Sequence, residues 1–138
     1  MFVALGLAVA IFVLSVAGHL SVVSWGRRLL NYRSSLPIKL AVALLALFSH
    51  LAVATLFAFG FWLGTILELG SFADAPLMGW MDYFYFSLVN LTTLGLGDVY
   101  PTQHLRVIAG VEAVTGFILI SCTAQLFWLS LHKGDTHE

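Results

Sequence analysis

The chain has 138 residues, of which 60% are hydrophobic and only 9% are charged. Such a composition leaves too little polar surface for an ordinary soluble domain and indicates an integral membrane protein. The six Lys and Arg residues nearly balance the seven Asp and Glu residues, so the charge gives no indication of a nucleic-acid partner. The one cysteine, Cys122, excludes a disulfide within the chain and is expected to be a small buried thiol.

Three segments are apolar enough to cross a membrane, namely residues 1–24, 38–67 and 104–131. As a helix, the first of them would be about 36 Å long, against a hydrocarbon core of about 30 Å. A cleaved signal peptide is the alternative for residues 1–24, but this segment has no basic n-region, its apolar run is too long, and positive charge follows it. We therefore expect a multi-pass protein with three transmembrane helices.

The charges between these segments predict an orientation. Four of the six basic residues lie in residues 25–39, and residues 68–80 carry acids but no Lys or Arg. By the positive-inside rule, the basic loop 25–37 and the tail 132–138 face the cytoplasm of a cell (inner or plasma) membrane, with the N-terminus outside. An interfacial anchor accounts for the arginines of this loop, and a lipid-headgroup site is the alternative.

Two histidines fall inside the apolar segments. His19 is interpreted as an interfacial side chain, since no second histidine stands at a four-residue helical spacing to form a metal pair with it. His50 lies near the middle of residues 38–67, where we expect a neutral histidine bonded to a neighbouring helix. A functional site is the alternative for His50.

A short aromatic segment, residues 83–92, would be only about 15 Å long as a helix, which is too short to cross. It is expected to be re-entrant, with Asp82 either as its N-cap or as an acid of its first turn. Residues 92–98 follow, with two threonines, two glycines at alternate positions and a carboxylate. Because glycine reaches positive φ without a steric cost, such a backbone can turn its carbonyls to one side. Where several chains meet at an axis, those oxygens can replace the water around a monovalent cation.

This stretch resembles the selectivity filter of potassium channels. Thr93, Leu94, Gly95, Gly97 and Asp98 match the family pattern, and Leu96 departs where tyrosine is usual. The resemblance extends over residues 83–128, about a third of the chain, which are similar to the pore helix, filter and inner helix of the bacterial potassium-channel pore family. Within that stretch Tyr85 stands at an aromatic position of the pore helix, and Arg106, Glu112 and Gly116 resemble a recurring series on the inner helix.

The resemblance implies an all-α membrane protein that assembles as a homotetramer with one filter loop per chain. Residues 38–131 would form the pore domain, and residues 1–24 a peripheral transmembrane helix. The implied K+ site consists of backbone oxygens, with Gly97 permitting the outer turn and Asp98 placing a ring of charge at the mouth. The backbone oxygens are those of Thr93, Leu94, Gly95 and Leu96, and the Thr93 hydroxyl is a further ligand of the ion. No enzymatic activity is expected, and K+ is a permeant ion, not a cofactor.

Two departures bear on selectivity. Leu96 cannot make the hydrogen bond that a tyrosine hydroxyl would make to pore-helix aromatics, and Val89 replaces a glutamate that pairs with the filter aspartate in some relatives. The sequence therefore predicts a K+-selective channel with a less rigid filter. A non-selective monovalent cation channel and a non-conducting membrane accessory protein are the alternatives.

The inner helix holds two further candidates. A carboxylate such as Glu112 costs free energy inside a membrane, so it needs a polar surrounding. Glu112 either supports the filter from behind, as Tyr85 would, or faces the conduction path. Gly116 serves either close packing or a gating hinge. For gating, the candidates are pH through His104 or His132, membrane lipids or tension, and a separate regulatory subunit.

Overall fold

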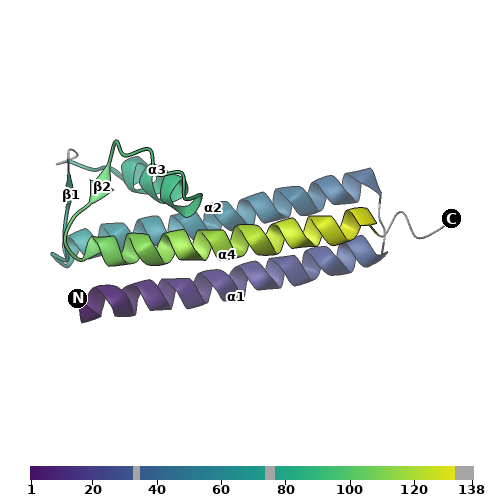
Figure 1. Cartoon of the computed structure of the whole chain (residues 1–138), viewed down its shortest axis with the longest axis horizontal. Coiled ribbons are helices and arrows are strands. Elements are labelled where there is room, and N and C mark those ends of the chain that lie inside the picture. The colour runs from purple at the N-terminus through teal and green to yellow at the C-terminus, as the bar shows by residue number, and fades with distance from the viewer. Residues whose placement is uncertain (33–34, 74–76, 133–138) are drawn as a thin grey trace.

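The computed structural model describes residues 1–32, 35–73 and 77–132, with side chains through residue 128. Within these ranges the chain is mostly helical, and a two-stranded ribbon accompanies the helices (Figure 1). In chain order the elements are α1 (Phe2–Tyr32), α2 (Leu36–Ile66), β1 (Phe72–Ala73), α3 (Trp80–Leu91), β2 (Tyr100–Pro101) and α4 (Leu105–His132). The long helices α1, α2 and α4 run side by side, and α3 packs on α2 and α4 on the side away from α1.

Three helices in the described part of the chain are long and apolar enough to span a membrane: Phe2–Tyr32, Leu36–Ile66 and Leu105–Trp128. The predicted fold class, an all-α membrane protein, is confirmed. The start of α1 lies at the same end of the bundle as the β-ribbon, and α4 ends at the opposite end (Figure 1).

The predicted loop 25–37 differs from the structure, because α1 continues as a helix through Tyr32 and α2 begins at Leu36. Basic side chains do not stop a helix, since arginine is a good helix former and its long stem can place the charge in water. α2 has a proline in its first turn, where a missing N–H costs nothing. Only a few residues therefore connect the two helices.

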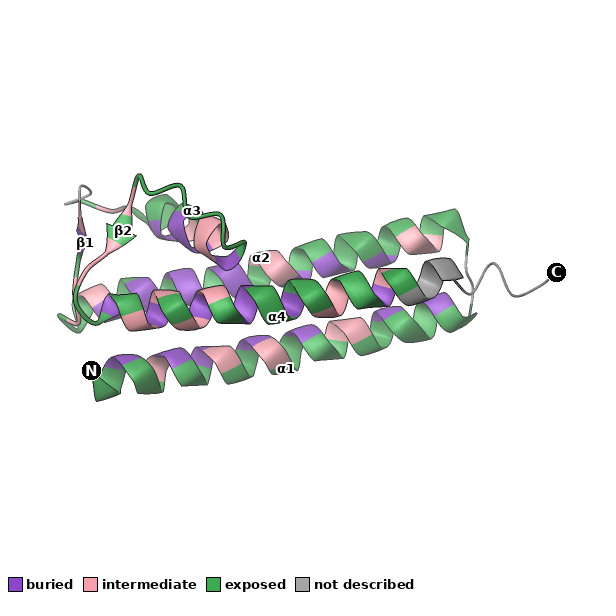
Figure 2. Ribbon diagram, viewed as in Figure 1, coloured by how far each residue is buried: buried purple, intermediate pink, exposed green. Residues whose placement is uncertain are grey.

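One face of α1 is buried against the rest of the bundle (Figure 2). Ala4, Ala8, Ile11 and Ser15 recur every three or four residues along this face, which is the spacing of one side of a helix. A Cβ built at Gly60 of α2 would lie 2.4 Å from Cδ1 of Ile11, so the glycine allows this close approach. The outward face of α1 carries exposed apolar side chains, as expected for a helix in contact with lipid.

His19 is the main correction to the sequence analysis inside the bundle. It is 1% exposed, so its interpretation as an interfacial residue is wrong. Its Nδ1 lies 2.9 Å from the Ser49 hydroxyl of α2, and its Nε2 lies 3.1 Å from the Thr123 hydroxyl of α4. A buried imidazole is tolerated where both ring nitrogens have partners, and these hydroxyls provide them.

His50 lies beside this cluster. Its Nδ1 lies 2.7 Å from the carbonyl oxygen of Ala46 in its own helix, and its ring meets the His19 ring edge-on at 4.7 Å between centroids. The predicted bond to a neighbouring helix is therefore replaced by a bond within α2 and a ring contact with α1.

The ribbon of β1 and β2 is a feature that the sequence did not predict. Phe72 is opposite Pro101 and Ala73 is opposite Tyr100 in an antiparallel pair. Next to it, the Thr102 N–H donates to the Ser71 carbonyl at 2.8 Å, and the Thr102 hydroxyl donates to the same oxygen at 2.9 Å. The segment before α3 and the segment after its loop are thereby fastened together.

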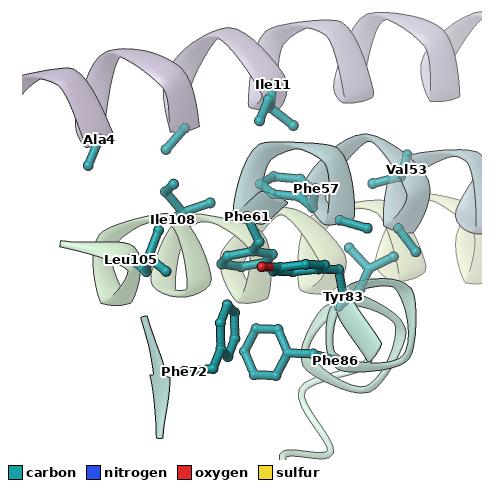
Figure 3. Packing of buried hydrophobic residues seen from close by; sticks show 14 of the residues in the cluster. Ala4, Ile11, Val53, Phe57, Phe61, Phe72, Tyr83, Phe86, Leu105 and Ile108 are labelled. Atoms are coloured by element: carbon teal, nitrogen blue, oxygen red, sulfur yellow. The ribbon is translucent and has the colours of Figure 1, made fainter. Parts of the chain in front are cut away.

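Aromatic side chains form the core under α3 (Figure 3). Phe61 of α2 meets Phe72 of β1 and Phe86 of α3 edge to face, with centroids 5.7 and 5.0 Å apart. Tyr83 packs on Phe72 in the same manner at 5.7 Å, and its hydroxyl lies 3.0 Å from that of Thr65. Edge-to-face pairs are favourable beyond their buried area, so this cluster fixes the position of α3 against α2.

Candidate functional site

The short helix α3 begins earlier than predicted, at Trp80. The carboxylate of Asp82 accepts a hydrogen bond of 2.8 Å from the N–H of Gly79, which precedes the helix. Of the two positions expected for Asp82, the structure shows the one in the first turn, where a negative charge stabilises the helix, and Gly79 is the N-cap. The helix ends at Leu91, and its length of about 18 Å is too short to cross a bilayer.

The C-terminal end of α3 reaches the middle of α4, where Gly116 lies. A Cβ built at Gly116 would lie 1.7 Å from the carbonyl oxygen of Leu91 and 2.7 Å from its carbonyl carbon. Any larger side chain would collide with the backbone of α3, so the glycine sets how closely the two helices approach. Close packing accounts for Gly116, and its use as a gating hinge stays a prediction.

The backbone of the loop after α3 has an alternating conformation. Positive φ angles occur at Thr93 (59°), Gly95 (54°) and Gly97 (77°), but not at Leu94 or Leu96 between them. Glycine adopts such angles freely, whereas a threonine there carries backbone strain. A strained residue persists only where its surroundings hold it, and this kind of strain is concentrated at functional sites.

The loop has little cover within one chain. Leu94 and Leu96 expose 66% and 58% of their side-chain surfaces, and a Cβ at Gly95 or Gly97 would meet no atom within 4 Å. Positive φ, and not a lack of space for a side chain, therefore explains why glycine occurs at positions 95 and 97. Large apolar side chains exposed in a row indicate a surface that other molecules cover.

One side-chain bond joins the end of the loop to α3. The Tyr85 hydroxyl donates to a carboxylate oxygen of Asp98 at 2.9 Å, and the other Asp98 oxygen accepts from the Val99 N–H at 3.1 Å. The bond to Asp98 raises the pKa of Tyr85, because the carboxylate favours the protonated phenol. A donor on the short helix therefore restrains the end of the loop, whereas Leu96 has no hydroxyl with which to do so.

Glu112 lies behind α3 and is fully buried. Its carboxyl group contacts the Ser87 hydroxyl, which lies 2.6 Å from the Ala54 carbonyl oxygen of α2. Its other oxygen accepts a 2.6 Å hydrogen bond from the Asn90 side chain, which also donates to the Ala109 carbonyl at 2.9 Å. Glu112 therefore points toward α3 and is connected through it to both α2 and α4.

Two polar residues of this network were not singled out as site residues by the sequence analysis. Ser87 is fully buried and Asn90 is partly buried, and both lie in α3. An asparagine within a short apolar membrane segment is itself a signal, since its amide requires a polar partner there. Which partner it would find depends on the packing of α3 against α4.

Residues 42–129 match a family described as "Ion channel". The match covers more than half of the chain, so the chain belongs to this family of ion channels, and the family predicted from residues 92–98 is confirmed. The family match begins within α2 and leaves α1 outside.

A relative named "Potassium channel K2", from Plasmodium berghei (strain Anka), is 48% identical over 29 residues. These residues are 21% of this chain and 2% of that protein, so the chain spans a very small part of that relative. No solved structure shows a significant match to the chain.

Proposed function

We propose that the chain assembles as a homotetramer in the cell membrane and conducts K+ passively along its axis. The observation that carries the proposal is the alternation of positive φ at Thr93, Gly95 and Gly97 in a loop that follows a half-length helix. Alternating backbone of this kind directs successive carbonyls to one side, and rings of carbonyl oxygens are the ligands that replace the hydration shell of K+.

The surroundings of the loop support the same proposal. Backbone outside regular structure is tolerated at membrane depth only when protein or a water-filled path surrounds it. The loop is exposed in a single chain, so copies of the chain would have to supply that surrounding. The C-terminal end of α3, which carries a partial negative charge, favours a cation in front of it.

In this proposal the backbone oxygens of residues 93–96 and the Thr93 hydroxyl coordinate the ion. Asp98 places negative charge at the mouth, where the loop enters from the outer side of the membrane. Glu112 and Tyr85 hold the loop from behind and from the side. Their function is to maintain the spacing of the oxygens and not to contact the ion.

A non-selective cation channel is the second candidate, and the observation that favours it is the exposed apolar side chain of Leu96. Leu96 cannot add the restraint that a hydroxyl at this position would add, and among the described residues the Tyr85–Asp98 bond restrains the end of the loop. A neutral hydrogen bond contributes about 0.5–1.5 kcal/mol. Without the bond that a hydroxyl at position 96 would make in each subunit, the oxygen rings are held less rigidly.

Flux through proteoliposomes of the purified protein tests conduction itself. We expect K+ flux in the wild type and its loss in Gly95→Ala, because a Cβ at a φ of 54° strains the loop. Gly6→Ala is the matched control, since a Cβ at Gly6 meets no atom within 4 Å and its backbone is helical. Undiminished flux in Gly95→Ala would reject the pore assignment and leave an accessory role.

A further inference from the structure

A pocket of about 430 Å³ opens between α1 and α4, far from the loop at the other end of the bundle. Arg27 and Arg28 line it near the end of α1, and Gln125 of α4 lines it from the other side. One side of the pocket is α1, which lies outside the residues that match the family, and the other side is α4, which lies within them up to residue 129.

The lining changes from charged to apolar along α1. Leu20 and Val23 of α1 form the part that lies toward the middle of the bundle, whereas Leu126 of α4 lies beside Gly26, next to the arginines. The helical rise from Leu20 to Arg28 is about 12 Å, which is comparable to the distance from a phospholipid headgroup into its acyl chains. The pocket is therefore amphipathic in the same direction as a membrane lipid.

The arginines are placed where a headgroup lies. Trp25 exposes 67% of its surface one turn or less from them, and Tyr32 exposes 89% at the end of α1. Exposed Trp and Tyr residues at helix ends mark the level of the membrane interface. Among the described residues that line the pocket there is no Asp or Glu, so no carboxylate there neutralises the arginines.

We propose that this pocket binds one anionic phospholipid, with its phosphodiester on Arg27 and Arg28 and its acyl chains along Leu20 and Val23. Basic pockets between transmembrane helices bind the headgroups of anionic lipids in this manner. A zwitterionic phospholipid fits less well because its choline group would add positive charge beside the arginines. A soluble phosphate could contact the arginines but would leave the apolar part of the pocket uncovered.

The chain provides its own reporter for this site. Cys122 lines the pocket and is the single cysteine of the sequence, so a maleimide labels the protein at one known position. We would measure the labelling rate in detergent, with phosphatidylglycerol, phosphatidylcholine or millimolar inorganic phosphate added. Phosphatidylglycerol is expected to slow labelling, whereas phosphatidylcholine and inorganic phosphate leave the rate unchanged.

Substitutions of the arginines then test the headgroup contact. The phosphatidylglycerol concentration for half-protection should rise about fivefold in Arg27→Gln or Arg28→Gln and about thirtyfold in the double variant. Lys39→Gln is the control, because Lys39 lies in the first turns of α2 near the same end of the bundle but does not line the pocket. Each rate is compared with that of the same variant without lipid, and the single variants serve if the double variant is unstable.

Four results would overturn the proposal. Equal protection by phosphatidylcholine would show a site without charge preference, and equal protection by inorganic phosphate would identify a soluble anion as the ligand. Protection that survives in both arginine variants, or that Lys39→Gln weakens as much, would show that the arginines do not hold the headgroup. None of these measurements requires conduction, so the lipid site and the proposed channel can fail separately.

Discussion

Replacing Glu112 with alanine removes the group that links α3 to α4 from behind the loop. Ser87 would keep its hydrogen bond to the Ala54 carbonyl, and Asn90 would keep its hydrogen bond to the Ala109 carbonyl. Both residues would lose the hydrogen bond to the Glu112 carboxyl group. The substitution also leaves a cavity at a fully buried position. The end of α3 would then be free to shift, and the loop that follows it would shift with it.

The expected cost follows from these contacts. Two lost hydrogen bonds at about 0.5–1.5 kcal/mol each, together with a polar cavity, amount to about 2–4 kcal/mol for each chain. In a homotetramer the effect is repeated in every subunit, so Glu112→Ala should melt well below the wild type and should not conduct. Differential scanning fluorimetry and proteoliposome flux measure the two effects on the same preparation.

Glu112→Gln is the matched control. The Ser87 hydroxyl has one proton and lies beside two oxygens, so a glutamine amide can donate to it while Ser87 donates to Ala54. The glutamine oxygen can still accept from Asn90. Glutamine should therefore retain stability to within about 1 kcal/mol and should conduct. A glutamine variant as damaged as the alanine variant, or a fully stable and conducting alanine variant, would refute this reasoning.

The remaining predictions concern the contacts on either side of the loop. Gly116→Ala should destabilise the protein and abolish flux, because its Cβ would lie 1.7 Å from the Leu91 carbonyl oxygen, whereas Gly110→Ala, with no atom within 4 Å, should melt no lower than the wild type. Equal melting temperatures for the two variants would contradict the close approach of α3 and α4. Tyr85→Phe should leave melting unchanged and speed the decay of K+ current, since only the bond to Asp98 is lost, and a current that decays at the wild-type rate would contradict this role. The same bond raises the pKa of Tyr85 above its ordinary value of 10.0, so the phenol stays protonated and restrains the loop up to about pH 9. The restraint should weaken only as pH rises further, and a pH series of the current decay measures this.

The parts of the site that could be predicted from the sequence are those that local chemistry determines. The sequence predicted a helix too short to cross, followed by a loop with alternating glycines, and α3 and the positive φ angles at Gly95 and Gly97 have that form. A position for Asp82 at the start of the helix was predictable because its carboxylate needs only a free N–H nearby in the sequence, which Gly79 provides. The positive φ of Thr93 was not predictable, since threonine has no preference for it.

Other features depend on contacts between distant segments. The ribbon of β1 and β2 has two residues in each strand, too few to show an alternating pattern, and its pairing follows from the way the outer segments meet. His19 was misplaced because its partners, Ser49 and Thr123, lie far away in the sequence on other helices. In the same way, the sequence draws attention to Gly116, but it does not show that Leu91 is its neighbour in space.

The most direct test of the central claim is the reversal potential of the purified protein in a bilayer with K+ on one side and Na+ on the other. A filter formed by residues 93–97 predicts a shift of about 59 mV or more in the direction of K+ preference, which corresponds to at least about tenfold selectivity. Current that Gly95→Ala removes would assign that shift to the loop. A reversal potential near zero, in a preparation that conducts, would contradict K+ selectivity and favour the non-selective channel.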